Sequence, residues 1–164
     1  MTASCRFVGG VICGLYCMLL LLACRESEPE QVLPSMPVRA TLQLNDAQYV
    51  HLQNIGEFLE VTERRGAFTY IGVGGLLVVH LVAPMDASVP FAAFDLYCPY
   101  CYPRTITHPR VRGQAGGLVA ECSTCSSKYD LTAGFGGCIE GPGRQLQRYR
   151  TNYSHSLRTL TIGN

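Results

Sequence analysis

The sequence predicts an all-β protein, a small antiparallel sandwich or barrel, on the basis of three observations. Short apolar or alternating segments recur along the chain and are separated by turn-forming residues. Glycine is abundant, at 17 of 164 residues, whereas charged residues make up only 15%, which favours strands and turns over long solvated helices. No segment shows the period of an amphipathic helix of three turns or a sustained heptad pattern.

The first segment, residues 1–23, is expected to be a lipoprotein signal peptide. Arg6 precedes an uncharged apolar run, Val8–Ala23, whose 16 residues would span about 24 Å as a helix, less than the ~30 Å of a bilayer core. A positive start, a short apolar run and small residues at its end are typical of a secretory signal. The residues before Cys24, Leu-Leu-Ala, resemble a bacterial lipobox, which implies lipidation of Cys24. An ordinary signal peptide or an uncleaved anchor is the alternative.

Residues 24–37 are predicted to form a lipidated, extended linker, because Arg25–Pro37 contains three prolines and several charges but no apolar period. A lipid on Cys24 would hold the protein at a bacterial membrane in the cell envelope, facing the periplasm or exposed on the outer membrane. Removal of the signal peptide takes away one basic residue, Arg6, and leaves 12 basic and 12 acidic residues. This balanced charge predicts no nucleic-acid partner.

The body, residues 38–164, contains the predicted strands. Thr41–Leu44 alternates like a half-buried strand, and Leu76–Val82 is an apolar run, broken only by His80, that suits a strand buried on both faces. Phe91–Tyr97 and Leu118–Glu121 each lead directly into a pair of cysteines. The other predicted strands are Phe58–Thr62, Ala67–Val73, Arg148–Thr151 and Leu157–Ile162.

Four cysteines form two CxxC pairs, Cys98 with Cys101 and Cys122 with Cys125, separated by 20 residues. Because each pair follows a predicted strand, two strand-to-turn junctions that face one another would bring four thiolates together. This donor set suits zinc, mononuclear iron or an iron–sulfur cluster, so these four residues are the predicted metal ligands. Structural disulfides are an alternative in an oxidising compartment. A bridge within one CxxC pair, however, closes only a very small loop and removes little unfolded-state entropy.

The pair Cys98-Pro-Tyr-Cys101 also matches the dithiol of glutaredoxins, and a dithiol oxidoreductase is therefore a further alternative. In that chemistry a helix N-terminus lowers the pKa of the first cysteine. Tyr102 and Pro103 follow here without an amphipathic period. No catalytic triad, pair of carboxylates or nucleotide-binding loop is evident, so the sequence indicates no other enzymatic activity.

The order of segments between about Phe91 and Leu160 resembles a Rieske-type [2Fe–2S] domain. The segments that carry the resemblance are Ala93–Cys98, Leu118–Cys125, Ser126–Gly134 and Gly141-Pro142-Gly143. The resemblance implies a Rieske-like antiparallel β-sandwich or barrel with a small subdomain similar to a rubredoxin or zinc ribbon. It also implies metal-binding loops within about residues 91–149, and a loop at Gly141 and Pro142 that covers the site.

The chain departs from the Rieske pattern at the ligands. The first histidine position falls on Tyr100 or Cys101 and the second on Cys125, while Pro103 and Thr124 replace a bracing pair of cysteines. A four-cysteine [2Fe–2S] cluster has a low potential, about −400 mV in plant-type ferredoxins against about −150 to +300 mV in Rieske centres. The resemblance thus implies a membrane-tethered iron–sulfur module for electron transfer, or a vestige of one, with an unidentified protein partner. The ligand change favours structural Zn²⁺ in an interaction module without redox activity.

Two further residues are possible auxiliary groups. His108 lies between the two cysteine pairs and is available as a ligand if one cysteine is not used, although an exposed loop histidine is the simpler interpretation. Cys138 is the odd thiol of the body. It is expected to be a small buried hydrophobe, or alternatively a reserve ligand or disulfide partner.

Overall fold

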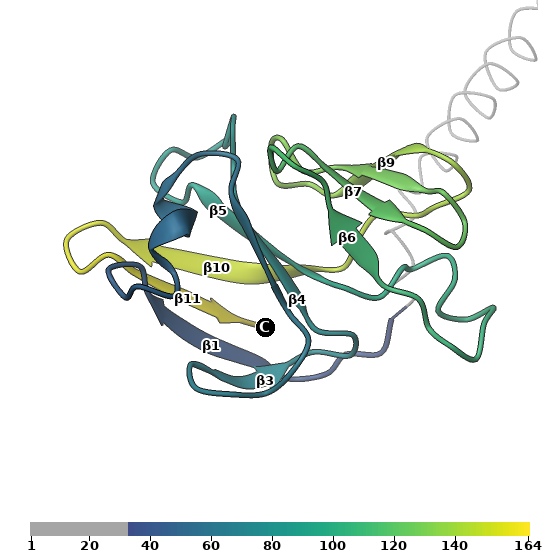
Figure 1. Ribbon diagram of the computed structural model, residues 1–164, viewed down its shortest axis with the longest axis horizontal. Coiled ribbons are helices and arrows are strands. Elements are labelled where there is room, and N and C mark those ends of the chain that lie inside the picture. Colours follow the sequence, from purple (N-terminus) through teal and green to yellow (C-terminus); the bar gives the residue numbers. More distant parts are fainter. Residues whose placement is uncertain (1–32) are drawn as a thin grey trace, which may run out of the picture. The chain divides into compact units, whose positions relative to one another are not determined.

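The computed structural model describes residues 33–164, which form two antiparallel β-sheets and a short 3-10 helix (Figure 1). The elements are β1 (Val38–Gln43), η1 (Val50–Gln53), β2 (Phe58–Val61), β3 (Phe68–Ile71), β4 (Leu76–His80), β5 (Phe91–Asp95), β6 (Val111–Gly113), β7 (Val119–Cys122), β8 (Lys128–Asp130), β9 (Gly137–Glu140), β10 (Arg148–Ser154) and β11 (Thr159–Gly163). Within this range no helix has the length and apolar character needed to cross a bilayer. The predicted signal peptide, Cys24 and the linker up to residue 32 lie outside the described residues.

The larger sheet has seven strands in the order β2-β4-β5-β10-β11-β1-β3 and curls into a nearly closed barrel. Its two edge strands, β2 and β3, are not paired with each other. Along β1 buried and exposed residues alternate strictly, so Val38, Ala40 and Leu42 enter the core while their neighbours face outward. The prediction of an all-β fold is thereby confirmed. The sequence left a sandwich and a barrel open, and the larger sheet forms a nearly closed barrel.

Strands β4 and β5 are buried on both faces, as the apolar run Leu76–Val82 predicted for β4. Leu76 and Val78 belong to the core inside the barrel, whereas Leu77 and Val79 belong to a second core on its outer face. Because successive side chains of a strand point to opposite faces, one strand can serve two cores. The second core is where the smaller sheet packs.

The smaller sheet has four strands in the order β6-β7-β8-β9 and carries the four cysteines. Its inward side chains, which include Val111, Ala120 and Tyr129, share the second core with residues of β4 and β5. The β6 edge of the smaller sheet contacts β2 of the larger sheet. There the Gly113 amide donates a hydrogen bond of 2.8 Å to the Glu60 carboxylate. An added Cβ at Gly113 would lie within 2.7 Å of the Phe58 ring, so a glycine allows this close approach.

Several boundaries differ from the predicted ones. The strand expected over Ala67–Val73 ends at Ile71, because Gly72 turns the chain with a φ of +74°. The strand expected over Phe91–Tyr97 ends at Asp95. Strands β6, β8 and β9 were not anticipated, since three or four residues cannot display a period and these strands depend on pairing with their neighbours.

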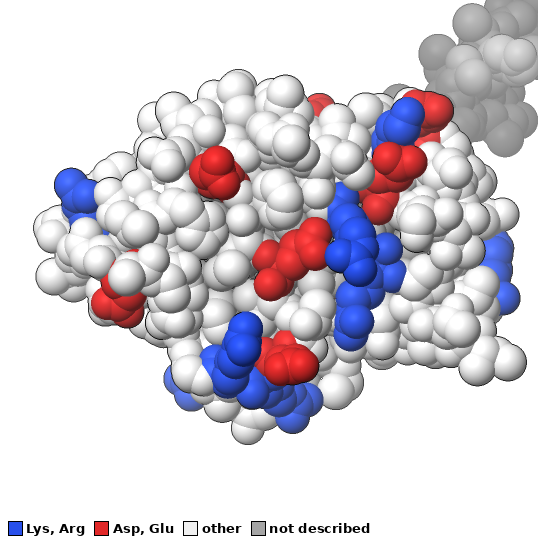
Figure 2. Space-filling model, in the orientation of Figure 1, with Lys and Arg blue, Asp and Glu red and all other residues white. Residues whose placement is uncertain are grey.

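Acidic and basic side chains are interspersed on the face shown in Figure 2, and neither sign forms a broad patch there. One ion pair, Lys128 with Glu140 at 2.7 Å, is formed within residues 33–164, and it is largely exposed. Exposed pairs of this kind contribute little to stability, so packing in the two cores determines the fold.

Candidate metal centre

The first cysteine pair lies on the loop that follows β5. Cys98 and Cys101 are both buried, and the backbone turns tightly between them, with the Tyr102 amide donating to the Cys98 carbonyl. The amide and hydroxyl of Thr105 both donate to the Cys101 carbonyl, at 2.9 and 3.0 Å. These bonds satisfy the backbone of a loop that has no regular structure, and they direct both sulfurs inward.

A buried carboxylate, Asp95, fixes the start of this loop. It accepts hydrogen bonds from the amides of Val73 (2.9 Å), Gly74 (3.0 Å) and Tyr97 (2.8 Å) and from the Tyr149 hydroxyl (2.7 Å). Burial and the neighbouring carboxylate raise the pKa of Tyr149 well above its usual range. Asp95 therefore joins the β3–β4 turn, the first cysteine loop and β10 at one point.

The second pair lies on the β7–β8 hairpin. Cys122 is the last residue of β7, and its carbonyl accepts from the Ser126 amide while its amide donates to the Ser127 carbonyl. Ser126 has a positive φ of +56°, a conformation that closes the turn so that Cys122 and Cys125 project to the same side. The sequence predicted that each cysteine pair follows a strand, and the position of Cys122 at the end of β7 agrees with this prediction.

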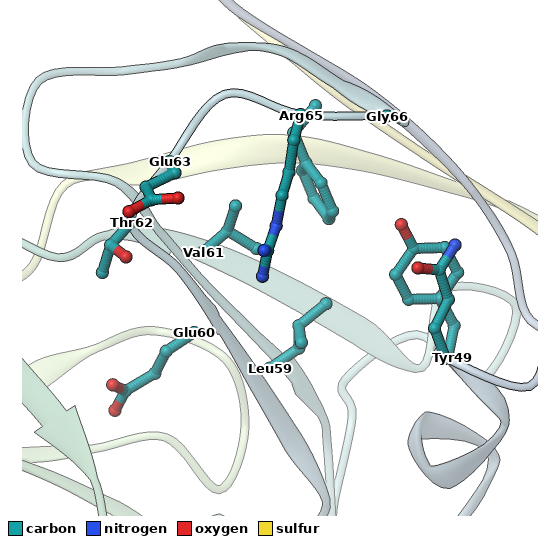
Figure 3. Close-up of a pocket in the computed structure, with 10 residues that line it drawn as sticks. Tyr49, Leu59, Glu60, Val61, Thr62, Glu63, Arg65 and Gly66 are labelled. Atoms are coloured by element: carbon teal, nitrogen blue, oxygen red, sulfur yellow. The ribbon is translucent and has the colours of Figure 1, made fainter.

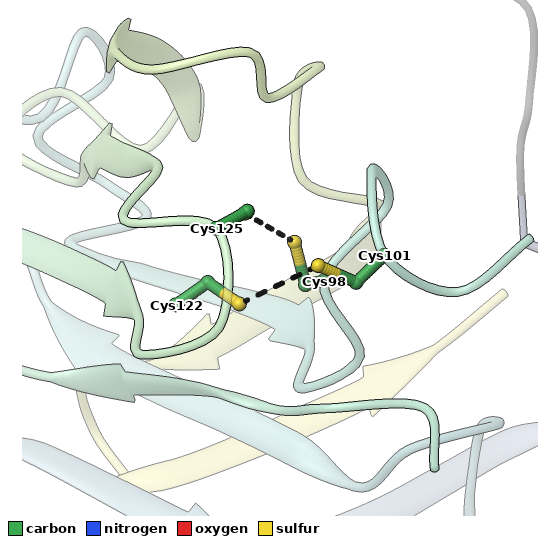
Figure 4. Close-up of side chains that lie close together, drawn as sticks. All are labelled: Cys98, Cys101, Cys122 and Cys125. Atoms are coloured by element: carbon green, nitrogen blue, oxygen red, sulfur yellow. Dashed lines mark hydrogen bonds between the residues drawn. The ribbon is translucent and has the colours of Figure 1, made fainter. Parts of the chain in front are cut away.

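The structure brings the four predicted ligands together (Figure 4). Their Sγ atoms all lie within 4.8 Å of one another, with Cys98 to Cys125 at 3.7 Å and Cys101 to Cys122 at 3.9 Å. Three of the four are buried and Cys125 is partly exposed. Four soft donors gathered around one point can hold a metal ion.

Two hydroxyl groups hydrogen-bond to the cysteine sulfurs. The Tyr129 hydroxyl lies 3.3 Å from Cys98 Sγ, and the Ser127 hydroxyl lies 3.1 Å from Cys125 Sγ. Desolvation raises the pKa of Cys98 to about 11 against the lowering effect of Tyr129. At Cys125 desolvation is outweighed by the bonds from the Ser127 hydroxyl and amide, which lower the pKa to about 7. The two partners of the Cys98–Cys125 sulfur pair thus differ strongly in acidity.

With Zn²⁺ as the probe, binding of a metal ion by the four cysteines is expected to release at least two protons near pH 8, because desolvation raises the pKa of both Cys98 and Cys101 above the ordinary thiol value. Isothermal titration calorimetry of zinc-free protein in buffers of different ionisation enthalpy measures this number. Since protons leave on binding, the apparent affinity should fall as the pH is lowered. Release of fewer than two protons would contradict this assignment of protonation states.

His108 is held away from the sulfur group. Its ring stacks on Tyr102 with the centroids 4.5 Å apart, and its Nδ1 lies 3.0 Å from the Tyr102 carbonyl oxygen. Tyr97 completes this ring cluster at 5.7 Å from His108. The geometry makes His108 a brace of the first cysteine loop, and only the four cysteines form the potential metal-binding group within residues 33–164.

Cys138 and the glycine-proline loop lie beside the second cysteine pair. Cys138 is partly exposed and its thiol donates to the Glu140 carbonyl at 3.2 Å. Gly141 and Pro142 are exposed, and an added Cβ at Gly141 would lie 2.9 Å from the Ser127 Cα. At Gly143 a Cβ would lie 2.7 Å from the Tyr129 hydroxyl and 2.8 Å from Cys138 Sγ. The loop therefore passes close to Ser127 and Tyr129, whose hydroxyl groups hydrogen-bond to the sulfurs.

The surroundings of Cys98 and Cys101 do not resemble those of a reactive dithiol. The next element after Cys101 is the strand β6, and within residues 33–164 no helix begins at either thiol. Burial raises the pKa of Cys98 to about 11, whereas dithiol catalysis depends on a lowered pKa. These features weigh against a dithiol oxidoreductase.

Asp95, Ser127 and Tyr149 are site residues that sequence-based reasoning did not assign a role. A charged residue within the apolar run of β5 was the available signal for Asp95, which is fully buried. The roles of Ser127 and Tyr149 depend on contacts between distant segments and leave no local signal. In comparisons with known proteins, neither a protein-family model nor a curated protein sequence matches the chain.

Proposed function

We propose that Cys98, Cys101, Cys122 and Cys125 hold one tetrahedral metal ion, Zn²⁺, and that the centre stabilises a structural interaction module. The observation that carries this proposal is the compactness of the sulfur group, whose members all lie within 4.8 Å of one another. A Zn–S bond of about 2.3 Å gives a tetrahedron with edges of about 3.8 Å. The Cys98–Cys125 and Cys101–Cys122 sulfur pairs, at 3.7 and 3.9 Å, match that edge.

The donor set supports a closed, structural centre. Structural zinc sites use four protein ligands, commonly four cysteines, whereas catalytic sites leave one position open. Cys98 and Cys101 come from the loop that leaves the barrel, and Cys122 and Cys125 come from the smaller sheet. An ion bound by all four cysteines would link the two sheets, and this crosslink would be its structural role.

A Rieske-like [2Fe–2S] module for electron transfer is the second candidate. It is favoured by the hydrogen bonds from Tyr129 to Cys98 and from Ser127 to Cys125, because bonds to ligand sulfurs tune the potential of iron–sulfur clusters. The order of the segments around both cysteine pairs, which resembles a Rieske domain, also supports it. Such a cluster divides its thiolates between two irons, and the compact sulfur group fits a single ion better.

Elemental analysis and the visible spectrum of purified, reduced protein distinguish the candidates. Colourless protein with one zinc per chain is the expected result. Brown protein with two irons per chain and visible absorption would replace zinc by the iron–sulfur candidate, and protein with neither metal would overturn both.

We also propose a lipid anchor at Cys24, from the sequence alone. The intact mass of protein purified from membranes would show whether acyl chains are attached.

A further inference from the structure

Apart from the metal centre, the open seam of the barrel contains a pocket of about 450 Å³. It lies where the edge strands β2 and β3 are not paired with each other. Gln48 and Tyr49, which precede η1, also line it. Its volume is in the range of small-molecule sites, about 300–1,000 Å³. The pocket is thus a consequence of the incomplete barrel.

Two unpartnered hydrogen-bond donors face this pocket (Figure 3). The Arg65 side chain extends into it, and no ion pair of this guanidinium is formed within residues 33–164. Tyr49, on the opposite side, is 6% exposed as a residue, and its hydroxyl, which is open to solvent, has no hydrogen-bond partner in the described part of the chain. Burial and Asp46 raise the pKa of Tyr49, while Arg65 opposes them, as a guanidinium that faces the same pocket would. A guanidinium and a hydroxyl facing one space form a site for a carboxylate.

The rest of the lining is apolar on one side and acidic on the other. Leu59, Val61 and Phe68 supply apolar surface. The carboxylate of Glu60 accepts a hydrogen bond from the Gly113 amide, whereas Glu63 lies beside Arg65 and forms no ion pair within residues 33–164. One cationic and two anionic groups disfavour a simple anion and favour a ligand that carries both charges.

We propose that this pocket binds a zwitterionic ligand of the amino-acid or short-peptide class. The ligand carboxylate would lie between Arg65 and Tyr49, its ammonium group toward Glu63, and its apolar side chains over Leu59 and Phe68. The volume suits a dipeptide. This binding site is independent of the proposed metal centre.

Titration of the full, metal-loaded chain with the dipeptide Leu-Leu, followed by NMR or calorimetry, tests the proposal. We expect saturable binding that weakens at least about tenfold in Arg65→Gln, and several-fold in Tyr49→Phe, because each variant loses a charge-assisted hydrogen bond. Arg64→Gln is the matched control, since Arg64 lies over the Tyr70 ring and outside the pocket. The Arg64→Gln variant should bind Leu-Leu with the same affinity as the unmodified chain.

Two capped probes test the charge requirement. Leu-Leu amide lacks the carboxylate and N-acetyl-Leu-Leu lacks the ammonium group, and both should bind at least about tenfold more weakly than the free dipeptide. Free leucine separates a single amino acid from a peptide as the preferred ligand. Absence of binding by leucine and the dipeptide up to about 10 mM would overturn the proposal, as would equal effects of Arg65→Gln and Arg64→Gln.

Discussion

Cys122→Ser is expected to abolish metal binding at the proposed centre and to unfold the smaller sheet while leaving the barrel folded. Structural zinc contributes about 10–16 kcal/mol of apparent binding free energy in zinc-finger peptides at pH 7, and a site with one ligand removed loses much of it. A loss of about 5 kcal/mol would lower the melting temperature by roughly 15 °C in a domain of this size. Metal analysis and thermal unfolding measure the two effects.

The expected unfolding is local because the two cores differ in what holds them. The core inside the barrel consists of barrel residues and contains no cysteine. The second core includes Cys98, Cys101 and Cys122, and the strands above it have only three or four residues each. Short strands depend on packing for their stability. Hydrogen exchange should therefore speed up across β6–β9 while β1 and β11 stay protected.

Cys138→Ser is the matched control for this experiment. Cys138 lies in the same sheet and packs against the same core, but it does not belong to the group of four sulfurs. Its replacement should leave the metal content unchanged and lower the melting temperature much less. If Cys122→Ser kept its metal, or if Cys138→Ser lost it, the assignment of the ligands would be wrong.

The spacing of the cysteines was the strongest predictor of the site. Two CxxC pairs, each directly after an apolar segment, were sufficient to predict that Cys98, Cys101, Cys122 and Cys125 meet, because a strand end and its turn fix where both sulfurs point. The double burial of β4 was likewise predictable, since its apolar run leaves no polar face. Both features are local patterns.

Features that depend on distant pairing were not predictable. The strands β8 and β9 pair through Tyr129 and Cys138, and neither segment has a period long enough to indicate a strand. The role of Asp95 depends on amides and a hydroxyl as distant as Tyr149, which is 54 positions along the chain. Tyr49 and Arg65 face one pocket at an unpaired seam, and a single sequence does not show where a barrel fails to close.

Asp95→Asn is expected to destabilise the protein by about 3–5 kcal/mol and to weaken metal binding. The Asp95 side chain is fully buried and accepts from four donors, three of them backbone amides. An asparagine would place an NH₂ donor where another donor already points, and removing one partner from a buried charged network leaves the others unsatisfied. Because the Tyr97 amide is one of those donors, the backbone that precedes Cys98 would shift.

Urea unfolding and metal titration of four proteins test this expectation. Tyr149→Phe removes one of the four hydrogen bonds and should cost about 1–2 kcal/mol, clearly less than Asp95→Asn. Asp86→Asn, in an exposed loop where the carboxylate accepts only from the Ser88 amide and hydroxyl, is the control for loss of a carboxylate and should lower the urea midpoint much less than Asp95→Asn. Since the centre needs both cysteine loops in register, Asp95→Asn should weaken zinc binding whereas Asp86→Asn should not. A stable Asp95→Asn protein with unchanged zinc affinity would show that the first cysteine loop holds its position without the buried carboxylate.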